Sequence, residues 1–370
     1  MAQPKTTIWE LEPHTSAKHE ILRRYLQAWA PILSHGRFPH LVVVDGFAGP
    51  GRYSKGEEGS PIIAIKAVIE QQRPISARVD FHFIELDKRR AEHLSTEIAA
   101  LKLPPNVTTT IHGGRAFQDA FPQLWDSYAP KPGRSRPPTF VFIDPFGFKI
   151  PFSHVAKILK AQSCEVLITF MFEEINRFLS QGQQPDNFDD LFGCRDWREG
   201  INIRAPSERL KFLHDLYQRQ LKQAAGARFV RSFAMRNDRN TMDYFLFFAT
   251  NNELGLKKMK EAMWRVDESG TYTFSDATDP NQSVLFTAEP DRQLLTRLIL
   301  DGFAGRETIV KDVEQFVVRE TPFRETHYKK VFKDLEEAGQ VVAVDPPAKR
   351  KRGQFGEPNM KLRFKPRQGS

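Results

Sequence analysis

The stretch "VVVDGFAGPGRY" (residues 42–53) decides the fold. An apolar run ends in Asp45, and Gly46, Gly49 and Gly51 follow within six residues. An acid at the end of a buried strand, followed by close glycines, is typical of a turn where the backbone approaches a ligand. The spacing matches G-x-G-x-x-G poorly and lacks G-K-[ST], so a dinucleotide is the weaker interpretation and a P-loop is excluded. An ordinary strand-to-helix turn is the structural alternative.

Strands and helices alternate along the chain around this loop. Strand-like runs are "HLVVVD", "ARVDFHFIELD", "NVTTTIHGG", "TFVFIDPFG" and "CEVLITFM", and runs such as "SPIIAIKAVIEQQ" and "KRRAEHLSTEIAAL" between them are helix-like. The alternation predicts an α/β fold, a mostly parallel Rossmann-like sheet with helices on both faces. Two late runs around a polar turn, within residues 228–251, indicate an antiparallel edge strand. A helix over about 15–29 comes first, and the polar residues 174–209 are read as an irregular insertion.

The composition of the chain changes before its C-terminal part. Acids, Ser, Thr, Asn and Pro crowd residues 273–293, so we predict two domains, 1–285 and 286–370. Three short helical runs and a two-stranded wing follow, the order of a winged helix-turn-helix, in which the third helix enters a nucleic-acid groove. The side chains expected at nucleic acid are His327, Lys329, Lys330 and Lys333 on that helix and Lys349, Arg350, Lys351 and Arg352 at the wing tip. A winged helix that docks on a protein is the alternative.

Positive charge is concentrated at the C-terminal end. The formal net charge is +8, and residues 347–370 hold eight bases against one acid, eight minus one, or +7. This favours a polyanionic partner. No secretory leader or membrane-spanning run is recognised, and the two cysteines, Cys164 and Cys194, lack metal-ligand spacing. We therefore expect a cytoplasmic protein without a metal or a disulfide framework.

The loop "DGFAGPG" resembles the first motif of class I S-adenosylmethionine-dependent methyltransferases, with Phe47 where many members have glycine. The resemblance implies that the loop, residues 45–51, wraps the methionine end of S-adenosylmethionine. The second strand then ends in an acid that accepts hydrogen bonds from the ribose hydroxyls, and Glu85 in "FIELD" fits, with Asp87 in reserve. The third strand often ends near an acid that meets the adenine amino group. Here Gly114 or Arg115 stands there, and Asp119 is a poor substitute.

The stretch "FIDPFGF" carries the expected chemistry. Asp144 follows an apolar strand at the sheet edge where ligands bind in open α/β sheets. The stretch resembles the D/N-P-P-Y/F motif of methyltransferases that modify exocyclic amines of bases, and "DPFG" is also the form seen in tRNA guanine-N2 methyltransferases. The resemblance implies that the Asp144 side chain and the Pro145 carbonyl accept hydrogen bonds from the target amine, and that Phe146 or Phe148 stacks on the flipped base. A simple Pro-Gly turn is the alternative.

Seven short motifs together resemble the three-Cys-motif partner protein family over about residues 15–370. They are "KHEILRRYLQAW", "DGFAGPGRY", "GSPIIA", "FIELD", "DPFG", "EINRF" and "GLKKMKEAMWRVD". The family is named for a neighbouring partner that resembles radical S-adenosylmethionine proteins, so such a partner is implied. The Lys-His pair before "GFAGPGRY" is also similar to an rRNA adenine-N6 methyltransferase family, which implies that Lys18 and His19 lie near the cofactor. Arg52 and Arg177 are candidates for contacting a phosphate or the cofactor carboxylate.

Three functions compete at this point. The first is a nucleic-acid methyltransferase acting on a base amine, adenine N6 or guanine N2. The second is a non-catalytic, nucleic-acid-binding scaffold, which the altered D-P-P-Y motif and the missing third-strand acid favour. The third, a nuclease built on Asp80, Glu85 and Lys88, has no trusted motif spacing. No Pro-Cys stands in a matching place, which argues against the thiolate route to cytosine C5.

Overall fold

The computed structural model describes residues 6–36, 38–133, 135–237, 239–267, 272–275 and 290–366. The chain forms two compact units. The first comprises Met1–Ala262 and Thr273–Gln282, and the second comprises Met263–Tyr272 and Ser283–Ser370. The predicted boundary at 285/286 lies outside the described residues.

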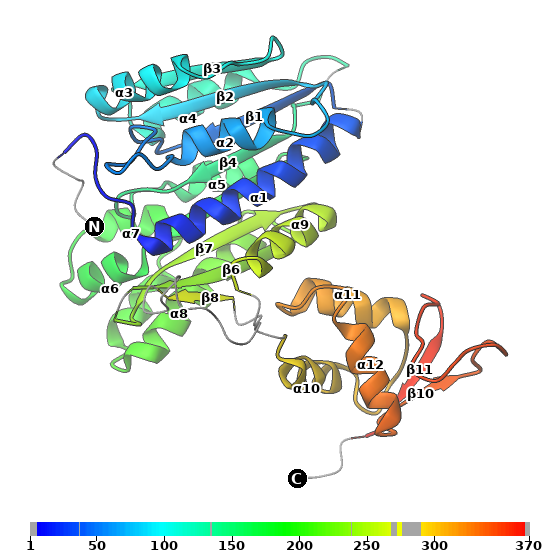
Figure 1. Cartoon of the computed structure of the whole chain (residues 1–370). Helices are drawn as coiled ribbons and strands as arrows, with labels where there is room; N and C mark the ends of the chain where they lie inside the picture. Colours follow the sequence, from blue (N-terminus) through cyan, green and yellow to red (C-terminus); the bar gives the residue numbers. More distant parts are fainter. Residues whose placement is uncertain are drawn as a thin grey trace. The chain divides into compact units, whose positions relative to one another are not determined.

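The first unit is built on one eight-stranded sheet (Figure 1). Its strands are β1 (His40–Asp45), β2 (Arg78–Glu85), β3 (Val107–Gly113), β4 (Thr139–Ile143), β5 (Cys164–Phe170), β6 (Phe229–Arg236), β7 (Met242–Thr250) and β8 (Thr273–Ser275). Their order in space is β3-β2-β1-β4-β5-β7-β6-β8, and β1 to β5 are parallel. This confirms the predicted Rossmann-like, mostly parallel sheet. The order reverses between β1 and β4, which places a ligand crevice at their carboxyl ends.

Helices cover both faces of the sheet. They are α1 (Pro13–His35), α2 (Ser60–Ile69), α3 (Lys88–Ala99), α4 (Phe117–Ser127), α5 (Phe152–Leu159), α6 (Phe172–Ser180), α7 (Pro185–Phe192), α8 (Pro206–Gln223) and α9 (Glu253–Trp264). Figure 1 shows α1 and α2 in front of the sheet and α4 and α5 behind it. The first helix is longer than predicted at both ends: it begins at Pro13, where a missing N–H costs nothing, and it continues through Pro31 to His35.

The antiparallel strand lies inside the sheet and not at its edge. β7 pairs with β5 on one side and with β6 on the other, antiparallel to both. All nine of its residues are buried. Its continuous apolar run therefore fits an interior strand that is covered on both faces.

The predicted irregular insertion is largely helical. Residues 172–202 form α6, α7 and the 3-10 helix η1 (Asp196–Asn202). Phe188 and Trp197 are buried in the core with their rings 4.8 Å apart, and the Trp197 Nε1–H donates to Asp189 Oδ1 at 2.7 Å. Tertiary packing of these aromatic residues makes short helices stable in a polar stretch.

The second unit confirms the predicted winged helix-turn-helix. It contains α10 (Arg292–Phe303), β9 (Glu307–Ile309), α11 (Val310–Glu320), α12 (Tyr328–Glu337), β10 (Val341–Val344) and β11 (Lys361–Phe364). The three strands form an antiparallel sheet in the order β10-β11-β9, so β9 adds a strand to the predicted wing. Val331, Phe332 and Leu335 form the buried face of α12.

No described helix combines the length and the apolar composition needed to cross a bilayer.

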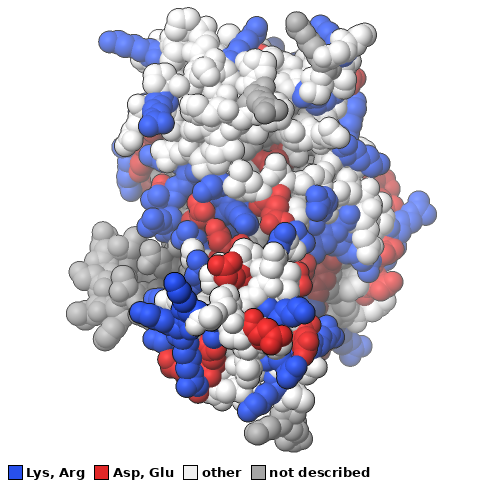
Figure 2. Space-filling model, turned by 90° about the vertical axis from the view of Figure 1, so that its right-hand side faces the viewer, with Lys and Arg blue, Asp and Glu red and all other residues white. Residues whose placement is uncertain are grey.

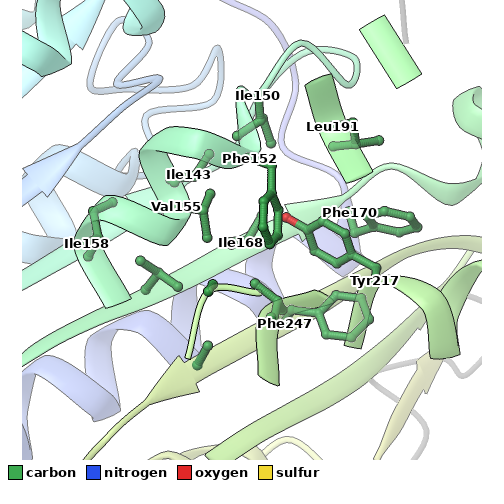
Figure 3. Packing of buried hydrophobic residues seen from close by; sticks show 14 of the residues in the cluster. Ile143, Ile150, Phe152, Val155, Ile158, Ile168, Phe170, Leu191, Tyr217 and Phe247 are labelled. Carbon is green, nitrogen blue, oxygen red and sulfur yellow. The ribbon is translucent and has the colours of Figure 1, made fainter. Parts of the chain in front are cut away.

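Tyr217 tests the core of the first unit. Its ring lies among Phe152, Phe170 and Phe247 (Figure 3), with centroid distances of 6.4, 4.6 and 5.2 Å. The buried hydroxyl finds no hydrogen-bond partner among the described residues. We expect Tyr217→Phe to leave the free energy of unfolding unchanged or raise it by about 1 kcal/mol, because an unsatisfied polar group is removed.

Tyr217→Ala removes the ring itself and should lower the free energy of unfolding by about 3–5 kcal/mol. Urea denaturation of both variants measures the difference. A Tyr217→Phe variant that loses as much stability as the alanine variant would show that the hydroxyl has a partner.

Candidate active site and nucleic-acid interface

The glycine loop after β1 has a shape that requires glycine. Gly49 and Gly51 have φ angles of +65° and +83°, in the left-handed region. A Cβ atom on Gly51 would lie 2.7 Å from Leu94 Cδ1, and one on Gly46 would lie 2.7 Å from Phe117 Cδ2. Main chain therefore packs closely against Leu94 and Phe117 at these two positions, where a side chain would displace its neighbour.

Asp45 holds the start of the loop from within. Its Oδ2 accepts from the Ser60 hydroxyl at 2.6 Å, and its Oδ1 accepts from the Phe47 N–H at 3.1 Å. Burial raises the pKa of Asp45 from its ordinary value of 3.8 to about 7, against the effect of these hydrogen bonds. Asp45 lines neither of the two cavities described below, so its carboxylate ties the loop to the start of α2.

Glu85, at the end of β2, holds the middle of the same loop. Its Oε2 accepts from the Gly49 N–H and its Oε1 from the Asp87 N–H, both at 2.8 Å. Burial raises the pKa of Glu85, and the two backbone donors work in the opposite direction. The ends of β1 and β2 are thus joined through one buried carboxylate.

Two cavities open at the carboxyl edge of the sheet. The larger, of about 480 Å³, is lined by several of the residues predicted for the methionine end and for the acceptor, among them Lys18, His19, Gly49, Gly51, Asp144 and Pro145. The smaller, of about 260 Å³, is lined by Gly46, Glu85, Leu86, Phe117 and Phe148 among others. Phe47, Pro145 and Phe146 border both cavities. The predicted cofactor and acceptor residues are therefore neighbours in space.

Asp144, just after β4, is paired with a lysine from α1. Lys18 Nζ lies 2.6 Å from Asp144 Oδ2 and 5.1 Å from the centre of the Tyr244 ring. The Lys18 side chain is only 7% exposed, and that of Asp144 is 22% exposed. The ammonium group therefore fixes one oxygen of the carboxylate at the cavity wall.

The two aromatic residues of "DPFGF" differ in access. Phe146 is half-buried and borders both cavities. Phe148 is buried and stacks on Phe188, with centroids 4.9 Å apart and planes at 7°. Phe146 is thus the more exposed of the two rings, whereas Phe148 anchors the loop to the core and lines only the smaller cavity.

The sequence reasoning missed the segment that precedes α1. Trp9 lines the larger cavity and packs edge-on against Phe146 and Tyr53, with centroids 5.4 and 5.8 Å apart. The Arg90 guanidinium lies 5.1 Å from the centre of the Trp9 ring and 5.7 Å from that of Phe146. Two aromatic residues near the site, Tyr53 and Tyr244, were also missed. In the sequence, only the large aromatic side chain of Trp9 within a polar segment indicated that residues before α1 pack at the site.

Three further predicted residues have defined places in the first unit. His19 lines the larger cavity, and burial together with the nearby Lys18 charge lowers its pKa to about 3, so the ring is neutral. Arg52 lines the same cavity, but its Nε donates to Glu97 at 2.7 Å. Arg177 lies 3.4 Å from Glu174 and lines neither cavity.

The end of β3 offers no acid to the smaller cavity. Arg115, Ala116 and Gln118 line it, and Asp119 does not. The Arg115 guanidinium donates to the Asp119 carbonyl at 3.2 Å and to Gln123 at 2.9 Å. Gln118 is the exposed polar side chain at this wall.

The predicted nuclease trio is not brought together. Glu85 braces the glycine loop, whereas Asp80 accepts hydrogen bonds from Tyr128 and His40, both at 2.8 Å, five residues earlier in β2. The described residues also contain no group of three or more His, Cys, Asp or Glu side chains that could hold a metal ion.

The predicted nucleic-acid residues of the second unit fall into two groups. Lys329, Lys330 and Lys333 on α12 and Lys349, Lys351 and Arg352 on the wing are exposed. His327 is partly buried against Trp264, with ring centroids 4.5 Å apart, and Arg350 is turned toward Glu336. Lys and Arg lie beside Asp and Glu on the face in Figure 2, so positive charge is interspersed with negative charge there.

Comparison with known protein families agrees with the winged helix-turn-helix of the second unit. The family model described as "GMT-like wHTH domain" matches residues 273–348. No curated protein matches the chain. Among solved structures, the chain is similar to the O-methyltransferase from Bacillus cereus in complex with SAH, at 14% identity over 65% of this chain and 82% of that chain, with a TM-score of 0.35.

A second similar structure is protein LPL1258 from Legionella pneumophila, at 14% identity over 62% of this chain and 84% of that chain, with a TM-score of 0.33. Because both TM-scores are low, the fold assignment rests on the strand order of the sheet itself.

Asp45→Asn tests the buried acid of the loop. Because the pKa of Asp45 is raised from 3.8 to about 7 in the folded state, its contribution to stability is complete below its unfolded pKa and is lost as pH rises through 7. Asparagine does not titrate. The wild type should therefore lose stability relative to Asp45→Asn as pH rises from about 4 to about 7. Urea unfolding across this pH range measures the difference in the free energy of unfolding. If the two proteins show parallel dependence of that free energy on pH, the raised pKa of Asp45 is contradicted.

Proposed function

We propose that the chain is an S-adenosylmethionine-dependent methyltransferase that acts on an exocyclic base amine of nucleic acid, adenine N6 or guanine N2. One observation carries the proposal. Asp144, Pro145 and Phe146 line the same cavity as Gly49 and Gly51 of the glycine loop. A methyl acceptor and a methyl donor must meet at one point, and this cavity holds the residues suited to each.

The residues at the sheet edge fit S-adenosylmethionine. Main chain at Gly49 and Gly51 suits the methionine end, because no Cβ projects from the loop there. Glu85 can still accept hydrogen bonds from ribose hydroxyls, since a carboxylate has about four acceptor sites and two are used by backbone N–H groups. Leu86, 53% exposed, and Phe117 give the smaller cavity apolar walls for an adenine ring. When bound, the cofactor supplies an electrophilic methyl group.

The acceptor amine is positioned by the "DPF" turn. Lys18 engages Asp144 Oδ2, so Oδ1 is the oxygen that accepts a hydrogen bond from the amine. The Pro145 carbonyl accepts the second, and Phe146 stacks on the base. These contacts align the nitrogen lone pair with the methyl group, and such positioning accounts for much of the rate enhancement in reactions of this kind.

The winged helix-turn-helix supplies affinity for nucleic acid. Exposed lysines on α12 and basic residues at the wing tip are suited to phosphates, which bind Lys and Arg irrespective of base sequence. The resemblance to the three-Cys-motif partner family supports a partner that resembles radical S-adenosylmethionine proteins, and the two cysteines without metal-ligand spacing support a cytoplasmic location.

Asp144 variants test the chemistry. We expect Asp144→Ala to lower methyl transfer by about 100-fold or more, because the amine loses its positioning group. Asp144→Asn is the matched control, since its amide oxygen still accepts a hydrogen bond and it should retain more activity. The assay follows labelled methyl transfer to DNA and RNA, with mass spectrometry of the nucleosides to identify the base.

Cofactor binding should change little in Asp144→Ala, because the glycine loop is untouched. If the wild type binds S-adenosylmethionine but methylates neither acceptor, the non-catalytic scaffold is the better description. Equal activity of the wild type and Asp144→Ala would remove Asp144 from the mechanism.

A further inference from the structure

The wing of the second unit is attached to α12 by a partly buried ion pair. Arg350 Nη2 donates to both carboxylate oxygens of Glu336, at 2.7 and 2.8 Å, and the two side chains are only 10% and 11% exposed. The Gly353 N–H donates to the same carboxylate at 2.6 Å. One acid near the end of α12 thus holds residues 350 and 353, on both sides of the wing tip.

The remaining contacts of Arg350 also face the domain. Its Nε donates to the Gln354 carbonyl at 2.7 Å, and its guanidinium lies 4.6 Å from the centre of the Phe355 ring. Phe355 in turn packs on Phe332 of α12, with centroids 4.9 Å apart. Arg350 therefore belongs to the interior of the wing, although it stands in a run of four consecutive bases.

The neighbours of Arg350 are more exposed than Arg350 itself. Lys349, Lys351 and Arg352 are exposed, and Arg352 Nη2 donates to the main-chain carbonyl of Glu336 at 3.1 Å. Gly353 lies against Lys333, because an added Cβ would be 2.9 Å from Lys333 Cγ. The wing cations are thus held beside the lysines of α12.

We propose that Glu336 and Arg350 are positioning residues that fix the wing against α12, so that both engage one DNA duplex together. The inference rests on the nucleic-acid binding of the proposed function. In this arrangement the Arg350 guanidinium is paired with the Glu336 carboxylate and contacts no phosphate. A B-form duplex is the partner that fits, because its major groove admits an α-helix, whereas the deep, narrow major groove of A-form RNA does not.

The proposal predicts a change in DNA affinity opposite to the change expected from net charge alone. Removing an acid from a DNA-binding surface strengthens binding if charge alone matters. Glu336→Gln removes an acid but also releases the wing, so binding should weaken. Glu337→Gln is the matched control, because Glu337 is the next residue, is 56% exposed and lies 3.9 Å from Lys333 in a loose ion pair.

The test is a salt titration of the full chain with a short, labelled DNA duplex of mixed sequence. Glu336→Gln should bind about tenfold more weakly than the wild type, and Glu337→Gln should bind equally or more tightly. Arg350→Met should also weaken binding, because the freed wing must be ordered on binding, but it should leave the slope of log Kd against log salt unchanged, because the ordered wing makes the same phosphate contacts in the complex. Lys351→Met should lower that slope by about one, as loss of a phosphate contact does.

Amide hydrogen exchange supplies a readout of folding. The Gly353 amide should exchange faster in Glu336→Gln while α11 and α12 keep their protection. The proposal is overturned if Glu336→Gln binds as tightly as Glu337→Gln, or if Arg350→Met lowers the salt slope as Lys351→Met does. A wild type that binds no duplex would overturn the nucleic-acid part of the proposed function as well, and the two failures are distinguished in this way.

Discussion

The first unit depends on two buried carboxylates that hold the glycine loop between β1 and α2. Asp45 engages Phe47 N–H and Ser60, and Glu85 engages Gly49 N–H. Burying an acid is costly unless it is hydrogen-bonded, and burial raises the pKa of both groups. The loop in turn needs these acceptors, because its left-handed glycines leave backbone N–H groups without helix or sheet partners. Neither the loop nor the acids would adopt this arrangement alone.

The sheet topology brings the remaining parts to this loop. The strand order reverses between β1 and β4, so the turn after β4 ends beside the glycine loop. Asp144 then meets Lys18 from α1, and Trp9 packs on Phe146 from the segment before α1. A cavity of about 480 Å³ lies within this group. The second unit also uses one carboxylate for two contacts. Glu336 neutralises Arg350 and accepts a hydrogen bond from the wing backbone at Gly353.

Long periodic patterns were predictable, and contacts between distant segments were not. The βαβ alternation and the order of the winged helix were visible because each element carries its own apolar periodicity. The antiparallel strand was misplaced at the edge although the apolar run of residues 244–249 in β7 indicated an interior position. The helices in residues 172–202 were missed because they depend on tertiary contacts of Phe188 and Trp197.

At the candidate site, too, residues marked by a local pattern were predictable and contacts between distant segments were not. Glu85 and Asp144 could be found because parallel strands present their carboxyl ends at one edge. The Lys18–Asp144 pair joins residues 126 positions apart, and only the family resemblance had pointed to Lys18. The direction of Arg350 could not be read from a run of four bases, because no periodicity marks which one turns inward.

Calorimetric titration with S-adenosylmethionine tests the central claim most directly, on the wild type, Gly49→Arg and Gly56→Arg. Both glycines have positive φ angles, +65° and +91°, so both variants carry the same charge and similar backbone strain. Gly49 lines the cavity, whereas Gly56 does not and has no atom within 4 Å of an added Cβ. The account predicts saturable binding by the wild type and Gly56→Arg, and none by Gly49→Arg. No binding by the folded wild type, or unchanged binding by Gly49→Arg, would contradict it.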